Sequence, residues 1–371
     1  MLRKVLVLYS PDHSGHKMAA TAIEEAFNLC YPQTNVRGIN LIKYTNPLLG
    51  AAATATYRGL VRNHPSLWRF FYDNVAVKEK TGKLRDIVHL SGYLRLRKIM
   101  DDLAPDAVIC TQAFPCIMVD KFKSITGHGP LLVGVVTDFF VNLFWNLKGV
   151  DLFCVAAEES KTEFVEMGAP AERIEVTGIP VRPRFARERD REKGRPGSSR
   201  AILLMGGVRG LGPMATVAER LCELTRNVRV IAVAGRNKRL QKKLAGVASR
   251  HPERLVVLEY VDNIDELMSQ SDLLISKAGG ITTSECLARK LPMVLVSPIP
   301  GQEVRNAEFL VEKGVAVLAN GAHDAARTAA DLVRDGSRLD RMKEGMAELS
   351  RPDSSLRIVD KIVAMSQARP R

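Results

Sequence analysis

Short apolar runs alternate with segments of helical periodicity along most of the 371 residues. The first run is Val5-Leu6-Val7-Leu8-Tyr9, and the apolar residues between His16 and Asn28 then recur on one helical face. Further strand-length runs occur at 35–42, 107–110, 131–136, 152–156, 201–205, 228–233, 255–258, 273–276, 293–296 and 315–318. Because helical segments separate these runs, the pattern predicts parallel βαβ units and an α/β fold.

One segment interrupts this alternation near the middle of the chain. Residues 183–199 are charged, poor in apolar residues and punctuated by Gly and Pro, which is typical of an interdomain linker. The chain also exceeds the length that one hydrophobic core usually serves. We therefore predict an N-terminal domain over 1–183, a linker over 184–199 and a C-terminal domain over 200–350, with a final segment over 351–371 whose helix (354–366) returns to the first domain.

A basic segment at 44–103 lies between the predicted strands of the first domain. From Leu41 to Met100 there are eleven Lys and Arg against three Asp and Glu, a local charge of +8 within a chain of net charge +13. We predict helices at 48–60, 66–77 and 83–103, which carry Trp68 among arginines such as Arg62 and Arg69. Basic residues interleaved with aromatic ones suit an anionic lipid surface, although a solvated basic face is the alternative.

Cysteine and hydropathy patterns limit the class of protein. The six cysteines are scattered and form no CxxC pair, so a zinc site or a disulfide framework is not indicated. No apolar run approaches the roughly 18 residues of a membrane-spanning helix, and the first apolar run is too short for a signal peptide. We therefore expect a cytoplasmic protein that associates with a membrane peripherally.

Four loops at predicted strand ends carry candidate chemistry, at 10–16, 205–214, 276–285 and 298–303. In the first three, glycines precede a helix start, which offers backbone N–H groups and the positive end of the helix dipole to an anion. Glu285 stands one turn inside its helix, where it could accept hydrogen bonds from ribose hydroxyls. Gln302 and Glu303 suit sugar hydroxyls. The alternatives are that His16 merely begins a helix and that the glycines serve helix–sheet packing.

These loops, in this order, resemble the plant-type monogalactosyldiacylglycerol synthases and bacterial processive diacylglycerol glucosyltransferases. That family is distantly related to the peptidoglycan N-acetylglucosaminyltransferase. The resemblance extends from Val5 to about Gly314 and includes Val136-Thr137-Asp138. It implies a GT-B fold, in which two doubly wound Rossmann-like domains face each other across a cleft. It also implies a UDP-sugar donor, a lipid acceptor such as diacylglycerol or a glycosyl-diacylglycerol, and inversion at the anomeric carbon. We expect no metal or cofactor, because the sequence has no strand-end DxD motif and the loop at 276–285 supplies a helix N-terminus for the diphosphate.

The resemblance also assigns roles to individual residues. His16 would be the general base, and Asp138 would orient or replace it. The residues facing UDP would be Gly206, Gly207, Gly279, Gly280, Thr282 and Glu285, with Gln302 and Glu303 facing the sugar. The residues on the acceptor and membrane side would be Gly15, Arg62, Trp68, Arg69 and Trp145. The chain departs from the family at His13, where the family has Gly, and near Asn142, where the family has His.

Three other functions remain open from the sequence. A UDP-N-acetylglucosamine-using transferase with a polyprenyl-linked acceptor, or a UDP-sugar 2-epimerase, would share the architecture. The amide at Asn142 favours a non-catalytic nucleotide-sugar sensor, because a neutral amide cannot take up and release a proton at neutral pH as an imidazole can. Nucleic acid is not expected as a partner, since the chain contains no recognised binding motif. The sequence leaves glucose, galactose and N-acetylglucosamine undistinguished.

Overall fold

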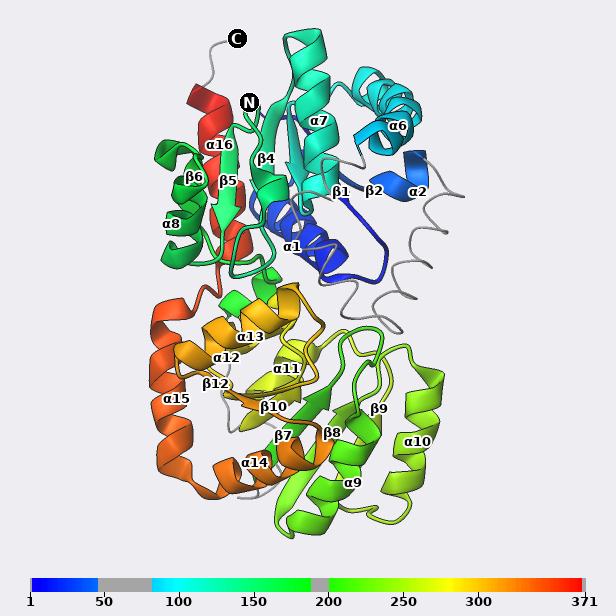
Figure 1. Cartoon of the computed structure of the whole chain (residues 1–371), viewed down its shortest axis with the longest axis vertical. Helices are drawn as coiled ribbons and strands as arrows, with labels where there is room; N and C mark the ends of the chain where they lie inside the picture. Colours follow the sequence, from blue (N-terminus) through cyan, green and yellow to red (C-terminus); the bar gives the residue numbers. More distant parts are fainter. Residues whose placement is uncertain (1, 46–81, 188–199, 369–371) are drawn as a thin grey trace. The chain divides into compact units, whose positions relative to one another are not determined.

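The computed structural model describes residues 2–45, 82–187 and 200–368. The predicted helices at 48–60 and 66–77, together with Arg62, Trp68 and Arg69, lie outside these residues. The chain divides into two units, each built around one parallel sheet (Figure 1). Unit 1 comprises Met1–Pro183 and Asp353–Arg371, and unit 2 comprises Arg184–Pro352.

The sheet of unit 1 has six parallel strands in the order β2-β1-β3-β4-β5-β6. The strands are β1 (Lys4–Tyr9), β2 (Asn35–Asn40), β3 (Ala107–Cys110), β4 (Leu131–Val135), β5 (Leu152–Val155) and β6 (Ile174–Val176). Three of them, β3, β4 and β5, are buried along their whole length, which explains their continuous apolar runs. β6 is not predicted from the sequence, because its three residues at the sheet edge are too few for a periodic signal.

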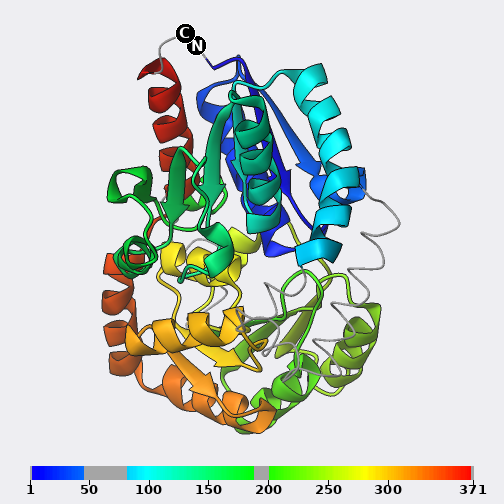
Figure 2. The ribbon, with the colours of Figure 1, turned by 45° about the horizontal axis from the view of Figure 1, so that its top comes forward.

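Helices cover both faces of this sheet. They are α1 (Gly15–Cys30), α2 (Leu41–Thr45), α6 (Gly82–Leu103), α7 (Ala113–Thr126), α8 (Glu158–Glu166) and α16 (Ser354–Ala368). On β1, Leu6 and Leu8 pack with the face of α6 and α7, whereas Val5 and Val7 pack with the face of α1 and α16. The ribbon in Figure 2 shows helices on both sides of this sheet. The final helix is therefore part of the core of unit 1.

The second strand ends earlier than the sequence predicts. We expected a strand through residue 42, but β2 stops at Asn40 and α2 begins at Leu41. The side-chain oxygen of Asn40 accepts the backbone N–H of Lys43 at 3.2 Å, which is a helix-capping contact. Leu41, although apolar and buried, belongs to this helix and not to the strand.

The sheet of unit 2 repeats the design with the order β12-β11-β10-β7-β8-β9. Its strands are β7 (Arg200–Met205), β8 (Val228–Val233), β9 (Leu255–Leu258), β10 (Leu273–Ser276), β11 (Met293–Val296) and β12 (Ala316–Ala319). Its helices are α9 (Met214–Leu224), α10 (Lys238–Ala248), α11 (Ile264–Ser269), α12 (Gly280–Arg289), α13 (Gln302–Glu312), α14 (Ala322–Arg334) and α15 (Gly336–Leu349). The core includes alternate residues of β7 with α9, α10 and α14 on one face.

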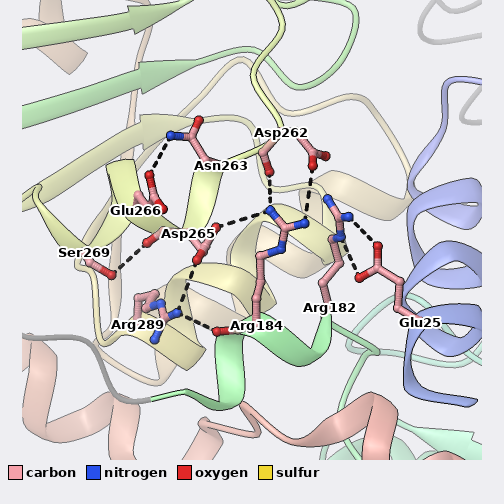
Figure 3. Close-up of polar contacts among 9 residues, drawn as sticks. All are labelled: Glu25, Arg182, Arg184, Asp262, Asn263, Asp265, Glu266, Ser269 and Arg289. Atoms are coloured by element: carbon pink, nitrogen blue, oxygen red, sulfur yellow. Dashed lines mark hydrogen bonds and ion pairs between the residues drawn. The ribbon is translucent and has the colours of Figure 1, made fainter. Parts of the chain in front are cut away.

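A cluster of ion pairs fixes the segment at which the chain enters unit 2. Asp265, which has no exposed surface, lies 3.7 Å from guanidinium nitrogens of both Arg184 and Arg289 (Figure 3). Arg289 also donates hydrogen bonds to the carbonyls of Arg184 and Arg187. Residues 184–187, which the sequence assigned to the linker, are thus anchored within unit 2. On the unit 1 side, Arg182 forms a two-point ion pair with Glu25 of α1.

Candidate active site

The strand order of unit 2 reverses between β7 and β10. From β7 the chain continues to β8 on one side, and from β10 it continues to β11 on the other. In doubly wound sheets the crevice outside the carboxyl ends of the strands at such a point is the usual ligand site. The loops that follow β7 and β10 begin at this point, and the loop after β11 begins one strand further along. The three candidate loops of unit 2 therefore lie at one edge of its sheet.

The loop after β7 is folded tightly on itself. A Cβ at Gly206 would lie 2.1 Å from the carbonyl oxygen of Leu211, so the loop's own backbone excludes any side chain there. Gly207 has φ of 69°, which glycine adopts without strain. The N–H of Leu211 donates to the Gly206 carbonyl at 2.9 Å and closes the turn. Gly206 is therefore required by the backbone of the turn itself, and not by the packing of a helix against the sheet.

The loop after β10 leads directly into α12. Gly279 is the N-cap and has no side-chain capping bond, and Gly280 is the first helical residue. Thr283 donates its hydroxyl to the carbonyls of Gly279 and Gly280, whereas Thr282 is partly exposed. The first N–H groups of a helix have no partner within the helix, and the dipole is positive there. This end of α12 is suited to the diphosphate that the sequence predicts, and Glu285 lies one turn further on with 6% of its surface exposed.

The loop after β11 is attached to the loop after β10 by side chains. Glu303, the second residue of α13, accepts from Lys277 Nζ at 2.6 Å and from the N–H of Ile299 at 2.8 Å. Asn306 is completely buried and donates to the Ala278 carbonyl at 3.1 Å. Gln302 is the first residue of α13. Lys277 has no role predicted from the sequence, because nothing local in the sequence pairs it with Glu303.

Unit 1 has an equivalent reversal between β1 and β3, and His16 lies beside it. His16 is the second residue of α1, after Gly15, and α1 begins where the loop after β1 ends. Its Nδ1 atom lies 2.8 Å from the carbonyl oxygen of Thr111 and 3.1 Å from the hydroxyl of Thr137. A carbonyl can only accept, so Nδ1 carries the proton and Nε2 is left as the acceptor nitrogen.

The protonation state of His16 follows from its surroundings. Burial lowers the pKa of His16 from 6.5 to about 4, and the hydrogen bond to the Thr111 carbonyl opposes this shift only in part. The imidazole is therefore neutral at neutral pH. A neutral imidazole whose Nδ1–H is held by the backbone can take a proton at Nε2.

Two further sequence-predicted residues of unit 1 are Asp138 and Trp145. The Thr111 carbonyl and the Thr137 hydroxyl contact Nδ1 of His16, and Asp138 follows Thr137 after β4, so its role beside His16 stays a prediction. Trp145 has 4% of its surface exposed and belongs to the hydrophobic core of unit 1, so its indole does not reach a membrane surface. A bulky aromatic ring at this position fills the space beside Gly134, whose added Cβ would approach it to 3.0 Å.

Asn142, near the position at which the family has histidine, has a structural role in this chain. Asn142 is the N-cap of the 3-10 helix Leu143–Trp145, and its side-chain oxygen accepts the N–H of Phe144 at 3.1 Å. Asparagine is among the residues preferred at such caps. Asn142 therefore helps to hold the loop after β4.

Two residues that orient His16 follow buried strands and have no role assigned from the sequence. Thr111 comes directly after β3, and Thr137 comes two residues after β4, which are the strands next to β1 and β3. A polar residue at the end of a buried strand was the available signal for both.

Within the residues that the structure describes, no three His, Cys, Asp or Glu side chains are grouped so that they could hold a metal ion.

Two doubly wound units with these strand-end loops define the GT-B class of glycosyltransferase folds. The fold is similar to the crystal structure of Acinetobacter baumannii MurG, with a TM-score of 0.62 at 16% identity over 98% of this chain and 100% of that one. It is also similar to a putative UDP-N-acetylglucosamine 2-epimerase from Listeria monocytogenes, with a TM-score of 0.66 at 14% identity over 100% and 98% of the two chains. These similarities concern the fold alone.

Sequence comparison identifies the family. Residues 16–181 match the model of monogalactosyldiacylglycerol (MGDG) synthase, and residues 201–355 match the glycosyltransferase family 28 C-terminal domain. The chain is 31% identical over 374 residues to a processive diacylglycerol beta-glucosyltransferase of Bacillus pumilus, covering 98% of this chain and 95% of the relative. The protein belongs to the family of monogalactosyldiacylglycerol synthases and processive diacylglycerol glucosyltransferases, and it is a sugar-transferring enzyme.

Proposed function

We propose that the enzyme transfers a hexose from a UDP-sugar to diacylglycerol or to a glycosyl-diacylglycerol, with inversion at the anomeric carbon. The observation that carries this proposal is the full-length similarity to relatives named processive diacylglycerol beta-glucosyltransferase. The loops of unit 2 support a nucleotide-sugar donor, because they combine the uncapped start of α12 with the carboxylates of Glu285 and Glu303.

Donor activation would depend on the start of α12. When the bond to the sugar breaks, negative charge grows on the diphosphate while the anomeric carbon becomes electron-poor. A helix N-terminus contributes about half a positive charge together with N–H donors. Groups fixed in place before the reaction stabilise this charge without reorganising. In this proposal the backbone of Gly279, Gly280 and Thr282 receives the diphosphate, and Glu285 accepts from the ribose hydroxyls.

Acceptor activation would depend on His16. The hydroxyl of a lipid acceptor has a pKa far above 7, so its proton must leave as the new bond forms. The neutral imidazole of His16 offers Nε2 for that proton, while the Thr111 carbonyl holds Nδ1–H and stabilises the imidazolium that results. The reaction is then a direct displacement, in which the acceptor oxygen bonds to the anomeric carbon as UDP departs.

The decisive experiment is a donor panel. Purified enzyme is incubated with radiolabelled UDP-glucose, UDP-galactose or UDP-N-acetylglucosamine and with diacylglycerol in anionic micelles, and labelled lipid is separated and counted. We expect label in lipid from at least one hexose donor. Release of UDP without any acceptor would instead identify an epimerase, and binding without turnover would identify a sensor. Transfer only to a polyprenyl-linked acceptor would overturn the diacylglycerol assignment.

Chelation tests the role given to the helix N-terminus. The sequence contains no strand-end DxD motif, which many metal-dependent glycosyltransferases use to bind the metal on the donor diphosphate. We expect the transfer rate to change less than about twofold after dialysis against EDTA, because backbone donors supply the charge stabilisation. The measurement is the initial rate before and after dialysis. Loss of activity that magnesium or manganese restores would contradict this account.

We further propose that the basic segment at 44–103 attaches the enzyme to an anionic membrane surface. The described part of the chain contains no helix long and apolar enough to cross a membrane. A basic surface would attach instead through charge, with about 1 kcal/mol for each basic residue near the lipid.

Vesicle binding tests this attachment. Replacing Arg62, Arg69 and Lys80 together with Glu should release the enzyme from vesicles that contain anionic lipid, and salt should weaken binding of the unaltered chain, since exposed charges are screened over about 8 Å at physiological ionic strength. Sedimentation with vesicles measures the bound fraction, and retained UDP affinity is the control for folding. Equal binding to neutral and anionic vesicles would refute the proposal.

A further inference from the structure

An ion pair with little solvent exposure links two of the strand-end loops in unit 2. Lys277 Nζ lies 2.6 Å from Oε1 of Glu303, and the two side chains are 12% and 14% exposed. The other carboxylate oxygen, Oε2, accepts the backbone N–H of Ile299 at 2.8 Å. Both oxygens of Glu303 are therefore held from fixed positions, so the carboxylate has little freedom to rotate.

The position of this pair connects it to the predicted diphosphate site. Lys277 directly follows β10, and Glu303 is the second residue of α13, after the neighbouring strand β11. A Cβ at Gly279 would lie 3.8 Å from Glu303 Oε1, so the carboxylate lies beside the N-cap of α12. The bond from Asn306 to the Ala278 carbonyl ties the same two loops together a second time.

A carboxylate beside the start of α12 is electrostatically unfavourable for a diphosphate bound there. The start of α12 is suited to a diphosphate, and an unpaired carboxylate beside it would repel that ligand. Lys277 compensates the charge of Glu303, while the carboxylate keeps acceptor capacity. An ionised carboxylate has about four acceptor sites, and two are occupied by Lys277 and Ile299. The remaining sites can accept hydroxyl groups of a sugar attached to the diphosphate.

We propose that Lys277 is a positioning residue for donor recognition, which fixes the carboxylate of Glu303 and compensates its charge so that it can bind the hexose of a UDP-sugar. This inference rests on the proposed function and adds a residue to the same site. Lys277 acts through Glu303 and does not itself contact the diphosphate. The effect of Lys277 on the position of the Glu303 carboxylate is therefore seen only with donors that carry a sugar.

Substitution of Lys277 with methionine separates this role from phosphate binding. The dissociation constants of UDP and of the accepted UDP-hexose are measured by calorimetry. We expect Lys277→Met to weaken UDP binding by about threefold, because the uncompensated carboxylate of Glu303 then repels the diphosphate. The ratio of the two constants should shift about tenfold against the UDP-hexose, because the positioned acceptor is lost. Lys277→Arg should keep most of the difference in affinity between UDP and the UDP-hexose. Lys242→Met, which removes an exposed lysine of α10, is the matched control and should leave the ratio unchanged.

A double-mutant cycle with Glu303→Gln tests the link between the two residues. In the Glu303→Gln background the further change Lys277→Met should have little additional effect on the ratio, because no charge remains to be compensated. Equal loss of UDP and UDP-hexose affinity in Lys277→Met would overturn the proposal and assign the lysine to the diphosphate. An unchanged ratio in a folded variant would also overturn it and leave the pair a purely structural link. Failure of the unaltered enzyme to bind any UDP-hexose would refute the proposed function instead.

Discussion

Replacing His16 with alanine is expected to lower kcat about a hundredfold or more, because the acceptor hydroxyl then loses its proton acceptor. Affinity for the UDP-sugar should change little, since the donor loops belong to unit 2. Steady-state kinetics with varied donor and calorimetry with UDP measure the two quantities. His128→Ala removes an exposed histidine of the same unit and should retain full activity.

Asp138→Asn distinguishes the two candidate bases. Since Thr111 and Thr137 orient His16, loss of the Asp138 carboxylate should affect kcat less than loss of the imidazole. Near-full activity of His16→Ala with an inactive Asp138→Asn would identify Asp138 as the base.

The pH dependence of kcat/KM provides a second readout for His16. Because burial lowers the pKa of His16 to about 4, the imidazole remains a base well below its ordinary pKa of 6.5. We expect the acid limb of kcat/KM to lie well below pH 6.5 in the unaltered enzyme. The folded state favours the neutral ring, so this residue also lowers stability as the pH falls from 6.5 towards 4. An acid limb centred at 6.5 would contradict a desolvated base.

Replacing Asp265 with asparagine is expected to destabilise unit 2 by about 3–5 kcal/mol, the usual cost of breaking a buried ion pair from one side. Asp265 has no exposed surface and pairs with both Arg184 and Arg289, and the side chain of Arg289 is only 7% exposed. The guanidinium of Arg289 would lose its buried counter-charge. The midpoint temperature of the thermal unfolding of unit 2 should fall by about 6–20 °C for a unit of this size.

Asp262→Asn is the control for this cluster. Asp262 pairs with Arg184 at 3.3 Å, but its side chain is 66% exposed, and exposed pairs contribute about 1 kcal/mol or less. If Asp262→Asn lowered the midpoint temperature as much as Asp265→Asn, burial of the ion pair would not be the reason for the loss of stability. A transition unchanged in Asp265→Asn would refute the stabilising role of the cluster.

The sequence by itself determined the class of fold and the places of the loops. Strands buried on both faces must be apolar at every position, so runs such as 107–110 and 293–296 mark their strands to the residue. Glycine next to a helix start is required by the local backbone conformation. The loops at 205–214 and 276–285 could therefore be found from the sequence alone. The resemblance to a known family rested on these same loops and was confirmed.

Only the tertiary structure decided which side chains meet. Thr111 and Thr137 are 95 and 121 residues from His16, and parallel pairing of β1, β3 and β4 brings them to it. Lys277 and Glu303 are 26 residues apart and meet because β10 and β11 are neighbours. Local sequence carries no record of such pairings, because they depend on which strands lie side by side. The burial of Trp145 was also decided by the tertiary structure. An aromatic residue gives the same local sequence pattern whether it faces lipid or the protein core, and Trp145 lies in the core.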